Sequence, residues 1–153
     1  MKTLTVHASC VAFGNKAILI RGQPGSGKSD IALQLIDGQG YGLGNKPLRA
    51  MLVADDQVIL ERIKGDIIVT APAILSGKLE IRGRGIVALP HKPKAKLMAV
   101  VEFKSRAEIE RMPEPEDMHV EILNLAFPRC YIDLAAPSAA ARIRSFFTEL
   151  RST

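Results

Sequence analysis

Two runs of strand-like residues open the chain, the first over residues 3–13 and the second over residues 16–22. Gly14 and Asn15 separate the runs, and this dipeptide readily adopts the positive φ angles of a tight turn. The pattern therefore predicts a β-hairpin near the start of the chain.

The apolar residues change to helical spacing after the second strand. A helix is predicted to begin near residue 28 and to end near Gly38. Residues 38–48 then carry spaced glycines, but they follow a helix, whereas the glycines of a dinucleotide-binding motif follow a strand. We therefore interpret residues 38–48 as a flexible connection. The predicted apolar face of the helix comprises Ile31, Ala32, Leu35 and Ile36.

Strands dominate the middle of the chain. An apolar strand within residues 49–60 meets two acidic residues, and residues 61–72 continue as a hairpin that turns around residues 64–66. Two further strands are expected within residues 78–90 and 96–103, joined by a basic loop that contains proline.

Two helices are predicted in the last third of the chain. Ser105 and Glu108 form a capping-box pattern that begins a short helix over residues 105–112. Ser138 can cap a second helix over residues 139–150, whose apolar residues recur at helical spacing and should pack on the sheet. Without an internal repeat or a linker, the pattern predicts a single α/β domain over residues 1–153.

The composition is typical of a globular protein with one core. Of the 153 residues, 47% are hydrophobic and 24% are charged, and no apolar run approaches the roughly 20 residues that a bilayer-spanning helix needs. The first residues lack the continuous apolar stretch of a secretory signal, and two cysteines are too few for a disulfide framework. We therefore expect a cytoplasmic protein with reduced thiols. The net charge of +5 favours anionic partners.

A glycine-rich stretch, GQPGSGKS, matches the phosphate-binding pattern G-x-x-x-x-G-K-[ST] without a mismatch. It lies between an apolar strand and an amphipathic helix, which is the setting that this motif requires. Its backbone N–H groups can surround a phosphate, Lys28 reaches the β- and γ-phosphates, and Ser29 ligates Mg²⁺. The predicted nucleotide-binding residues are Gly22, Gln23, Pro24, Gly25, Ser26, Gly27, Lys28 and Ser29.

Asp55 and Asp56 follow an apolar strand, where a P-loop enzyme needs a carboxylate for Mg²⁺. Because adjacent strand residues point to opposite faces, both acids can serve one site only if the strand ends there and the backbone turns. We expect that turn. One carboxylate would then lie near the metal, and the other would accept a proton from an attacking hydroxyl. The alternative is a pair of solvated acids at a strand end.

Glu80 and Arg82, in the stretch LEIRGRGI, alternate on one face of a predicted strand, and Gly83 and Gly85 permit a close approach of another group to the backbone. Glu80 would point toward a metal and Arg82 toward a transferring phosphate. By spacing alone, an ordinary cross-strand ion pair is the simpler explanation of these two residues.

Four stretches and their order resemble the catalytic domain of HPr kinase/phosphorylase, namely VHASCV, GQPGSGKSD, LVADDQV and APAILSGKLEIRGRGIV. The likeness covers residues 5–90, and the element EIRG-x-GI is more specific to that family than a P-loop. The resemblance implies an α/β fold with a P-loop-containing mixed β-sheet and flanking helices, similar to that of HPr kinase and PEP carboxykinase. It also implies a short form that consists of the catalytic domain only.

The activity that this resemblance implies is that of a kinase that uses ATP and Mg²⁺ to phosphorylate a serine of the phosphocarrier protein HPr. The same enzymes remove that phosphate with inorganic phosphate and release pyrophosphate. Family members assemble as hexamers, so the resemblance implies a homo-oligomer. Neither a nucleic acid nor a membrane is an expected partner.

The resemblance also implies roles for single residues. His7 matches the active-site histidine, Asp55 matches the acid that acts as general base and general acid, and Arg82 matches the arginine of the signature strand. The implied metal ligands are Ser29, Asp56 and Glu80. The implied catalytic residues are His7, Lys28, Asp55, Asp56 and Arg82.

The chain departs from the family pattern in three places. The P-loop contains Gln23 and Pro24 and is followed by Asp30, where the family usually has Glu; residues 38–49 form a longer connection than usual; and the sequence diverges after residue 90. In longer members the divergent region carries a further functional arginine. Arg129 is a candidate replacement for it, and a surface or packing role fits Arg129 equally well.

Three other functions share part of this pattern. A small-molecule kinase with the same P-loop is the leading alternative, with Arg82 and Arg84 as a phosphate clamp. A GTPase is disfavoured because the stretch NKPL lacks the aspartate of the guanine-binding pattern N-K-x-D. A nucleic-acid-binding module is suggested by the basic loop HKPKAK, but the chain lacks aromatic platforms for bases.

Overall fold

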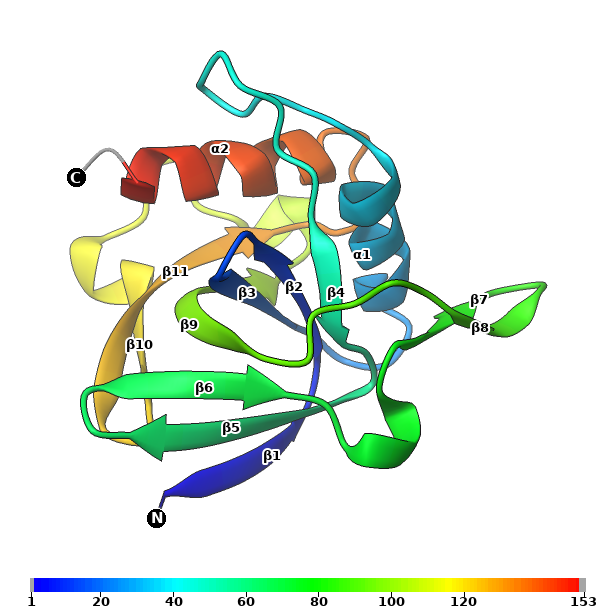
Figure 1. The fold of residues 1–153 in the computed structure, drawn as a ribbon. Helices are drawn as coiled ribbons and strands as arrows, with labels where there is room; N and C mark the ends of the chain where they lie inside the picture. The colour runs from blue at the N-terminus through cyan, green and yellow to red at the C-terminus, as the bar shows by residue number, and fades with distance from the viewer. Residues whose placement is uncertain (1, 152–153) are drawn as a thin grey trace.

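A computed structural model describes residues 2–151 and places β3 (Lys16–Arg21) inside a large curled sheet (Figure 1). β3 pairs antiparallel with β2 (Ser9–Phe13) and parallel with β9 (Ala95–Phe103). The loop after β3 leads into α1 (Lys28–Asp37). The predicted phosphate loop therefore follows an interior strand and opens a helix.

The other strands extend this sheet on both sides of β3. They are β1 (Thr3–His7), β4 (Met51–Ala54), β5 (Gln57–Ile63), β6 (Asp66–Thr70), β10 (His119–Ile122) and β11 (Leu125–Ile132). The strand order is β1-β5-β6-β9-β3-β2-β4, and β11 pairs with both β9 and β10. Because β3, β9 and β11 are parallel, their carboxyl ends lie at one edge of the sheet. β7 (Lys78–Ile81) and β8 (Gly85–Ala88) form a separate two-stranded sheet.

The sheet has a core on each face, as the alternation of side chains along a strand requires. On one face, Ile18 and Ile20 of β3 pack with α1 and with α2 (Ala139–Arg151). On the other face, Leu19 packs against residues of the curled part of the sheet. The structure thus has the α/β class expected from the sequence, with two helices covering one face (Figure 1).

Several predicted elements are confirmed. Gly14, with a φ of 63°, lies in the turn of the β2–β3 hairpin, and Lys64, with a φ of 59°, lies in the turn of the β5–β6 hairpin. The helices α1 and α2 occupy the predicted segments. The buried apolar residues of the two helices include Ile31, Ala32, Leu35, Ile143 and Phe147.

The strand predicted over residues 3–13 is two strands. The strand is interrupted at Ala8, whose backbone N–H donates a hydrogen bond to the carbonyl oxygen of Asp56 at 3.3 Å. β1 then pairs with β5, whereas β2 pairs with β3 and β4. Residues adjacent in the sequence therefore serve distant parts of the curled sheet.

The helix predicted over residues 105–112 was wrong. Only a 3₁₀ turn forms, over Arg106–Glu108, and the hydroxyl of Ser105 donates to the Glu108 carboxylate at 2.6 Å instead of capping a backbone N–H. The side chains of Ser105 and Glu108 thus satisfy one another, and no helix propagates. The strands β10 and β11 were not predicted from the sequence.

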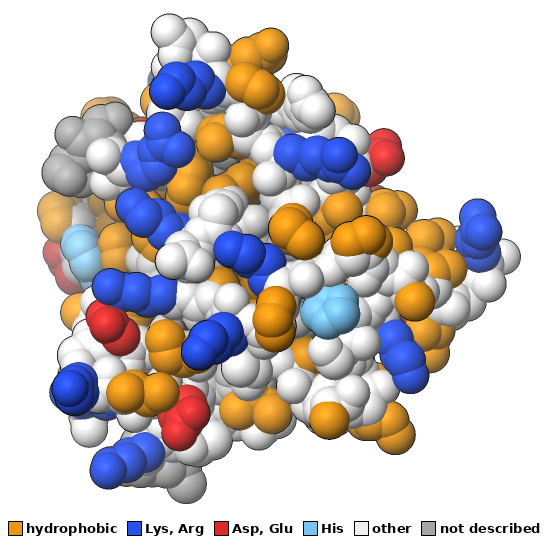
Figure 2. Space-filling model, in the orientation of Figure 1, with side chains coloured by type: hydrophobic (Ala, Val, Ile, Leu, Met, Phe, Trp, Pro, Cys, Tyr) orange, Lys and Arg blue, Asp and Glu red, His pale blue; other side chains and the backbone are white. Residues whose placement is uncertain are grey.

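Basic side chains are spread over the face of the molecule that Figure 2 shows, whereas acidic side chains there are few. This distribution agrees with the net charge of +5. No helix among residues 2–151 is long and apolar enough to cross a membrane.

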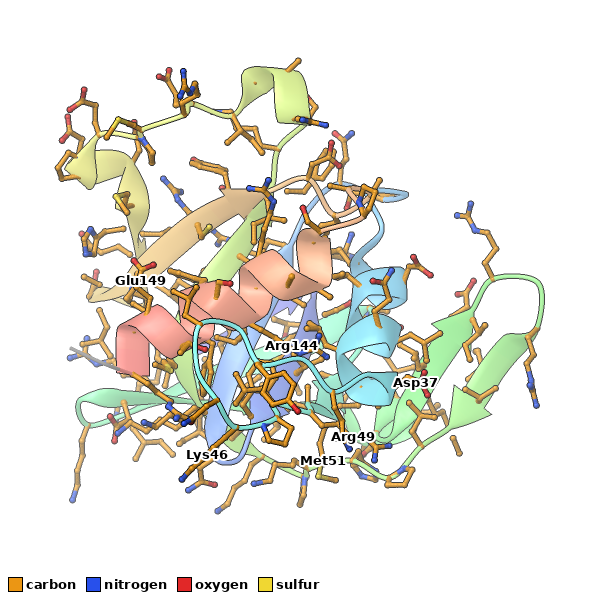
Figure 3. The ribbon with its side chains drawn as sticks, turned by 90° about the horizontal axis from the view of Figure 1, so that it is seen from above. Asp37, Lys46, Arg49, Met51, Arg144 and Glu149 are labelled. Atoms are coloured by element: carbon orange, nitrogen blue, oxygen red, sulfur yellow. The ribbon has the colours of Figure 1, made fainter. Side chains whose placement is uncertain are left out.

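Arg144 fixes the connection between α1 and β4 (Figure 3). This buried side chain of α2 donates from Nε to the carbonyl of Leu48 at 2.9 Å and from Nη2 to the carbonyl of Gly38 at 2.9 Å. Nη2 also lies 3.5 Å from the carbonyl oxygen of Leu35. Burial lowers the pKa of the Arg144 guanidinium. The connection is thus anchored at both ends, which differs from the flexible segment that the sequence suggested.

Both cysteines are free, as predicted. Burial raises the pKa of the Cys10 thiol well above its usual range. Burial and then the nearby Glu149 raise the pKa of the Cys130 thiol. Because the thiolate is the reactive form, neither cysteine is suited to nucleophilic catalysis.

Candidate nucleotide-binding site

The phosphate loop depends on its glycines for both space and backbone conformation. Gly25 and Gly27 have φ angles of 82° and 102°, which L-residues with a side chain rarely adopt. At Gly22, a Cβ atom would lie only 2.8 Å from Cβ of Phe103. These three glycines let the chain leave β3 and enter α1 in a tight loop.

Lys28 folds back over the start of this loop. Its Nζ donates to the carbonyl oxygens of Gly22 at 2.8 Å and Gln23 at 3.1 Å. The ammonium group is therefore held above the loop by neutral acceptors, and no acidic side chain forms an ion pair with it among residues 2–151. A triphosphate placed in the loop would meet this positive charge.

Asp55 lies at the centre of the predicted site. Its carboxylate is buried and accepts a hydrogen bond from the hydroxyl of Ser29, which lies 2.8 Å and 3.0 Å from the two carboxylate oxygens. It also accepts a hydrogen bond from the hydroxyl of Ser9 at 2.6 Å. The backbone N–H of Glu80 lies 3.4 Å from Asp55 Oδ2. A buried carboxylate is tolerated when several donors surround it, and these donors come from β2, α1 and β7.

Asp56 faces solvent at the expected turn. Its φ of 69° marks the point where the chain leaves the β4 direction, and the backbone N–H of Gln57 donates to the Asp55 carbonyl at 2.8 Å. The Asp56 carboxylate lies 3.9 Å from Nδ1 of His7, and these side chains are 71% and 78% exposed. The two acids therefore have different surroundings, one buried at the phosphate loop and one accessible.

Glu80 reaches the site through β7. Its neighbour Leu79 is fully buried in the core, which fixes the strand, and the N–H of Glu80 approaches Asp55. The Glu80 side chain itself is exposed. The structure thus brings the backbone of Glu80 next to Asp55, and a role of its carboxylate at a metal stays a prediction.

Arg82 does not share a strand face with Glu80. β7 ends at Ile81, and Arg82 lies in the turn that is closed by a hydrogen bond from the Arg84 N–H to the Ile81 carbonyl at 2.9 Å. The expected alternation fails because Gly83 adopts a φ of 86° and reverses the chain there. Arg82 is exposed on a hairpin that projects from the body of the molecule (Figure 1).

Arg129 has partners of its own outside this site. Its guanidinium lies 3.5 Å from the Glu102 carboxylate and donates to the Asp117 carbonyl at 3.1 Å and 3.2 Å. Glu102 also holds Arg21, with Nη2 and Oε1 2.6 Å apart. Arg129 therefore belongs to an ionic cluster with Glu102 of β9 and with Arg21, the last residue of β3 before the phosphate loop.

Ser9 is the site residue that sequence reasoning missed. Its side chain is fully buried and donates to Asp55, 46 positions away in the chain. No local motif marks such a residue. The pairing of Cys10 with Ala54 across β2 and β4 is what brings Ser9 next to Asp55.

The oxygen atoms at this site suit a magnesium ion in a nucleotide complex. Mg²⁺ prefers carboxylate and hydroxyl oxygens together with phosphates, in place of a cage made by the protein alone. Ser29 and Asp55 supply a hydroxyl and a carboxylate in direct contact. No group of three or more His, Cys, Asp or Glu side chains that could hold a metal ion occurs within residues 2–151.

Comparison with known proteins gives a family match over most of the chain. The family model for the HPr serine kinase C-terminal domain matches residues 1–145. A protein named HPr kinase/phosphorylase from Clostridium acetobutylicum is 32% identical over 130 residues, which are 78% of this chain and 39% of that protein. A protein of the same name from Cupriavidus necator is 31% identical over 143 residues, which are 87% of this chain and 41% of that protein.

The chain thus spans about two fifths of the length of these curated relatives. A solved structure, described as the HPr(Ser) kinase/phosphatase from Coxiella burnetii, superposes with a TM-score of 0.78. The match covers 97% of both chains at 21% sequence identity. This likeness shows that the two chains share a fold.

Proposed function

The chain belongs to the HPr serine kinase C-terminal domain family, and we propose that it transfers the γ-phosphoryl group of ATP to a serine hydroxyl of the phosphocarrier protein HPr. In the reverse direction, inorganic phosphate would attack the phosphoserine, release the free hydroxyl and form pyrophosphate. The observation that carries the proposal is the direct contact of Ser29 with Asp55, which couples the phosphate loop to the acidic pair.

The phosphate loop would bind the triphosphate. Its backbone N–H groups and the N-terminus of α1 stabilise negative charge, and Lys28 can exchange its two carbonyl acceptors for phosphate oxygens. Ser26 Oγ is buried in the loop and has no hydrogen-bond partner among residues 2–151. A phosphate oxygen would supply the missing acceptor after a small shift of the loop.

Ser29 would hold Mg²⁺, and the ion would supply positive charge beside the phosphates of the bound nucleotide. Asp55 would orient the Ser29 hydroxyl from the side opposite the phosphates. Glu80, exposed beside Asp55, is the second carboxylate that we propose for the metal. These assignments keep Ser29 and Glu80 in their predicted roles.

The contacts of the two acids favour a different general base from the one that family resemblance implies. Asp55 already accepts the hydroxyls of Ser9 and Ser29, and its burial separates it from an incoming protein. Asp56 is exposed and lies next to His7. We therefore assign the general-base role to Asp56, with His7 as its neighbour, and a positioning role to Asp55.

Arg82 would act from the projecting β7–β8 hairpin. Its exposed guanidinium is suited to a phosphoryl group or to the acceptor protein that brings the serine. The hexamer implied by family resemblance, a cytoplasmic location and the organisation of residues 1–153 as one catalytic unit also belong to this proposal. Light scattering of the purified chain would test the oligomer.

The decisive experiment incubates the purified chain with HPr, Mg²⁺ and ATP and locates the product by mass spectrometry. We expect one phosphoserine on HPr, and we expect its loss with release of pyrophosphate when inorganic phosphate replaces ATP. A panel of sugars and nucleosides offered in place of HPr tests the small-molecule kinase. Transfer to a member of that panel, with none to HPr, would refute the proposed acceptor.

A matched pair of variants separates the two acids. The change Asp56→Asn should abolish transfer in both directions and leave ATP binding within about twofold, because the exposed carboxylate does not touch the loop. The control is Glu61→Gln, an exposed acid on β5 whose loss should change neither quantity. Full transfer activity in the Asp56→Asn variant would show that another group is the base.

A further inference from the structure

A hollow lies at the carboxyl ends of β9 and β11, outside the predicted site. It has a volume of about 560 Å³ and lies between the segment that follows β9, the end of β11 and the start of α2. Its apolar lining includes Ile109, Ile132 and Pro137, and its basic lining includes Arg106, Arg111 and Arg142. Neither the acidic pair nor the phosphate loop contributes to it.

The sheet topology puts this hollow and the acidic pair on opposite sides of the phosphate loop. β3 pairs with β2 on one side, and β2 pairs with β4, which ends at Asp55. On its other side β3 pairs with β9, and β9 pairs with β11. Because the metal and the γ-phosphate must lie near Ser29 and Asp55, the other end of the nucleotide has room on the β9 and β11 side.

Packed side chains of Leu134 and Phe103 lie between the hollow and the phosphate loop. Leu134 follows the lining residue Asp133, and its Cβ lies 3.5 Å from where a Cβ of Gly27 would be. Phe103, at the end of β9, lies against Gly22 in the same way. The segment that lines the hollow therefore packs directly beside the phosphate loop.

Size and chemistry fit a nucleoside. Ligand pockets of about 300–1,000 Å³ are usual for small molecules, and they combine apolar walls with a few polar groups. The guanidinium groups of Arg106 and Arg111 form no ion pair among residues 2–151, so both remain available for stacking on a base or for a hydroxyl group. Tyr131 also lines the hollow, and its ring centroid lies 4.6 Å from Lys104 and 4.7 Å from Arg129.

We propose that this hollow binds the base and ribose of the nucleotide whose phosphates occupy the P-loop, with Ile109, Ile132 and Pro137 against the base. The inference rests on the proposed function, because it requires a nucleotide in the loop. It assigns a role to residues 104–111 and 131–142 of the divergent region, for which the sequence suggested only Arg129 as a candidate functional residue. The hydrogen bond from the Arg106 N–H to Asp133 at 3.1 Å joins two of the segments that line the hollow.

The test compares two ligands that share the phosphates and differ in the nucleoside. Titration calorimetry would measure the binding of ATP and of inorganic tripolyphosphate, each with Mg²⁺. The change Ile109→Trp fills the hollow from a partly exposed position. It should weaken the binding of ATP about tenfold and leave the affinity for tripolyphosphate within about twofold of the unaltered chain. The control is Ile63→Trp, on an exposed position of β5, which should alter neither affinity.

Two results would overturn the nucleoside site. One is an unchanged ATP affinity in the Ile109→Trp variant, and the other is an equal loss for both ligands. Photolabelling of the unaltered chain with 8-azido-ATP gives a second measurement that needs no variant. We expect labelled peptides from residues 104–111 or 131–142, and labelling confined to other segments would contradict the proposal.

The outcomes also separate this inference from the proposed kinase activity. If HPr is not phosphorylated but Ile109→Trp still weakens ATP alone, the nucleoside site stands and the acceptor is wrong. If the unaltered chain binds neither ATP nor tripolyphosphate, both the phosphate loop assignment and the nucleoside site fall.

Discussion

Ser29 and Asp55, 26 positions apart in the chain, are joined by the Ser29 hydroxyl, which lies 2.8 Å and 3.0 Å from the two oxygens of the Asp55 carboxylate. The contact ties the first turn of α1 to the end of β4. It also orients the hydroxyl that would hold Mg²⁺ at the phosphate loop. The position of α1 relative to the acidic pair is thereby fixed by a side-chain contact within the protein.

The change Asp55→Asn should destabilise the fold. An amide accepts through one atom only, so its NH₂ group would face one of the donors Ser9, Ser29 or the Glu80 N–H. We expect the free energy of unfolding to fall by about 1–3 kcal/mol, measured by urea denaturation. Asp56→Asn, at an exposed position, should change it by less than about 0.5 kcal/mol. Equal losses in both variants would contradict the buried role of Asp55.

The change Lys28→Ala should remove the charge that the phosphates meet. We expect kcat/KM for phosphorylation of HPr to fall at least about 100-fold, because a positioned cation at the transferring group is lost. Lys46→Ala, in the exposed connection after α1, serves as control and should retain full activity. Comparable rates in the Lys28→Ala and control variants would remove the P-loop from the mechanism.

The change Arg144→Met should loosen the connection between α1 and β4. The carbonyls of Leu35, Gly38 and Leu48 would lose their shared donor, and we expect a loss of about 2 kcal/mol or more in the free energy of unfolding. Arg142→Met, two positions earlier on the exposed face of α2, should cost less than about 0.5 kcal/mol. Thermal or urea unfolding of the two variants side by side decides the matter.

The change Gly42→Ala should be unfavourable for two reasons. Gly42 has a φ of 61°, and a Cβ atom there would lie 2.6 Å from the carbonyl oxygen of Arg144. We expect a loss of stability of at least about 1 kcal/mol. At Gly65 no atom lies within 4 Å of such a Cβ, so Gly65→Ala should be neutral or slightly stabilising, by up to about 1 kcal/mol. A lower melting temperature for Gly65→Ala than for Gly42→Ala would be the opposite of this expectation.

Local signals in the sequence predicted the elements whose causes are local. The hairpin turn at Gly14, the helix faces of α1 and α2, and the turn at the acidic pair all depend on residues close together in the chain. The predicted helix at Ser105 failed although its capping pattern was present. A short segment gains little from capping alone when it buries no apolar face, and most helix stability comes from packing.

The strands β10 and β11 were missed because their reason to form is not local. β11 is a strand because it pairs in parallel with Val100 to Phe103 of β9, which lie more than twenty positions earlier in the chain. Its sequence contains Pro128, which argues against a strand when read alone. The turn at Arg82 likewise follows from the backbone of Gly83, and the spacing of Glu80 and Arg82 did not reveal it.

The sequence by itself determined the phosphate loop, because consecutive residues between one strand and one helix supply every group that the loop needs. It also determined that two acids would follow a buried strand. Only the tertiary structure decided which acid faces the loop and which faces solvent. That choice depends on Ser9, Ser29 and the backbone of Glu80, which surround one carboxylate only after β2, α1 and β7 have packed together.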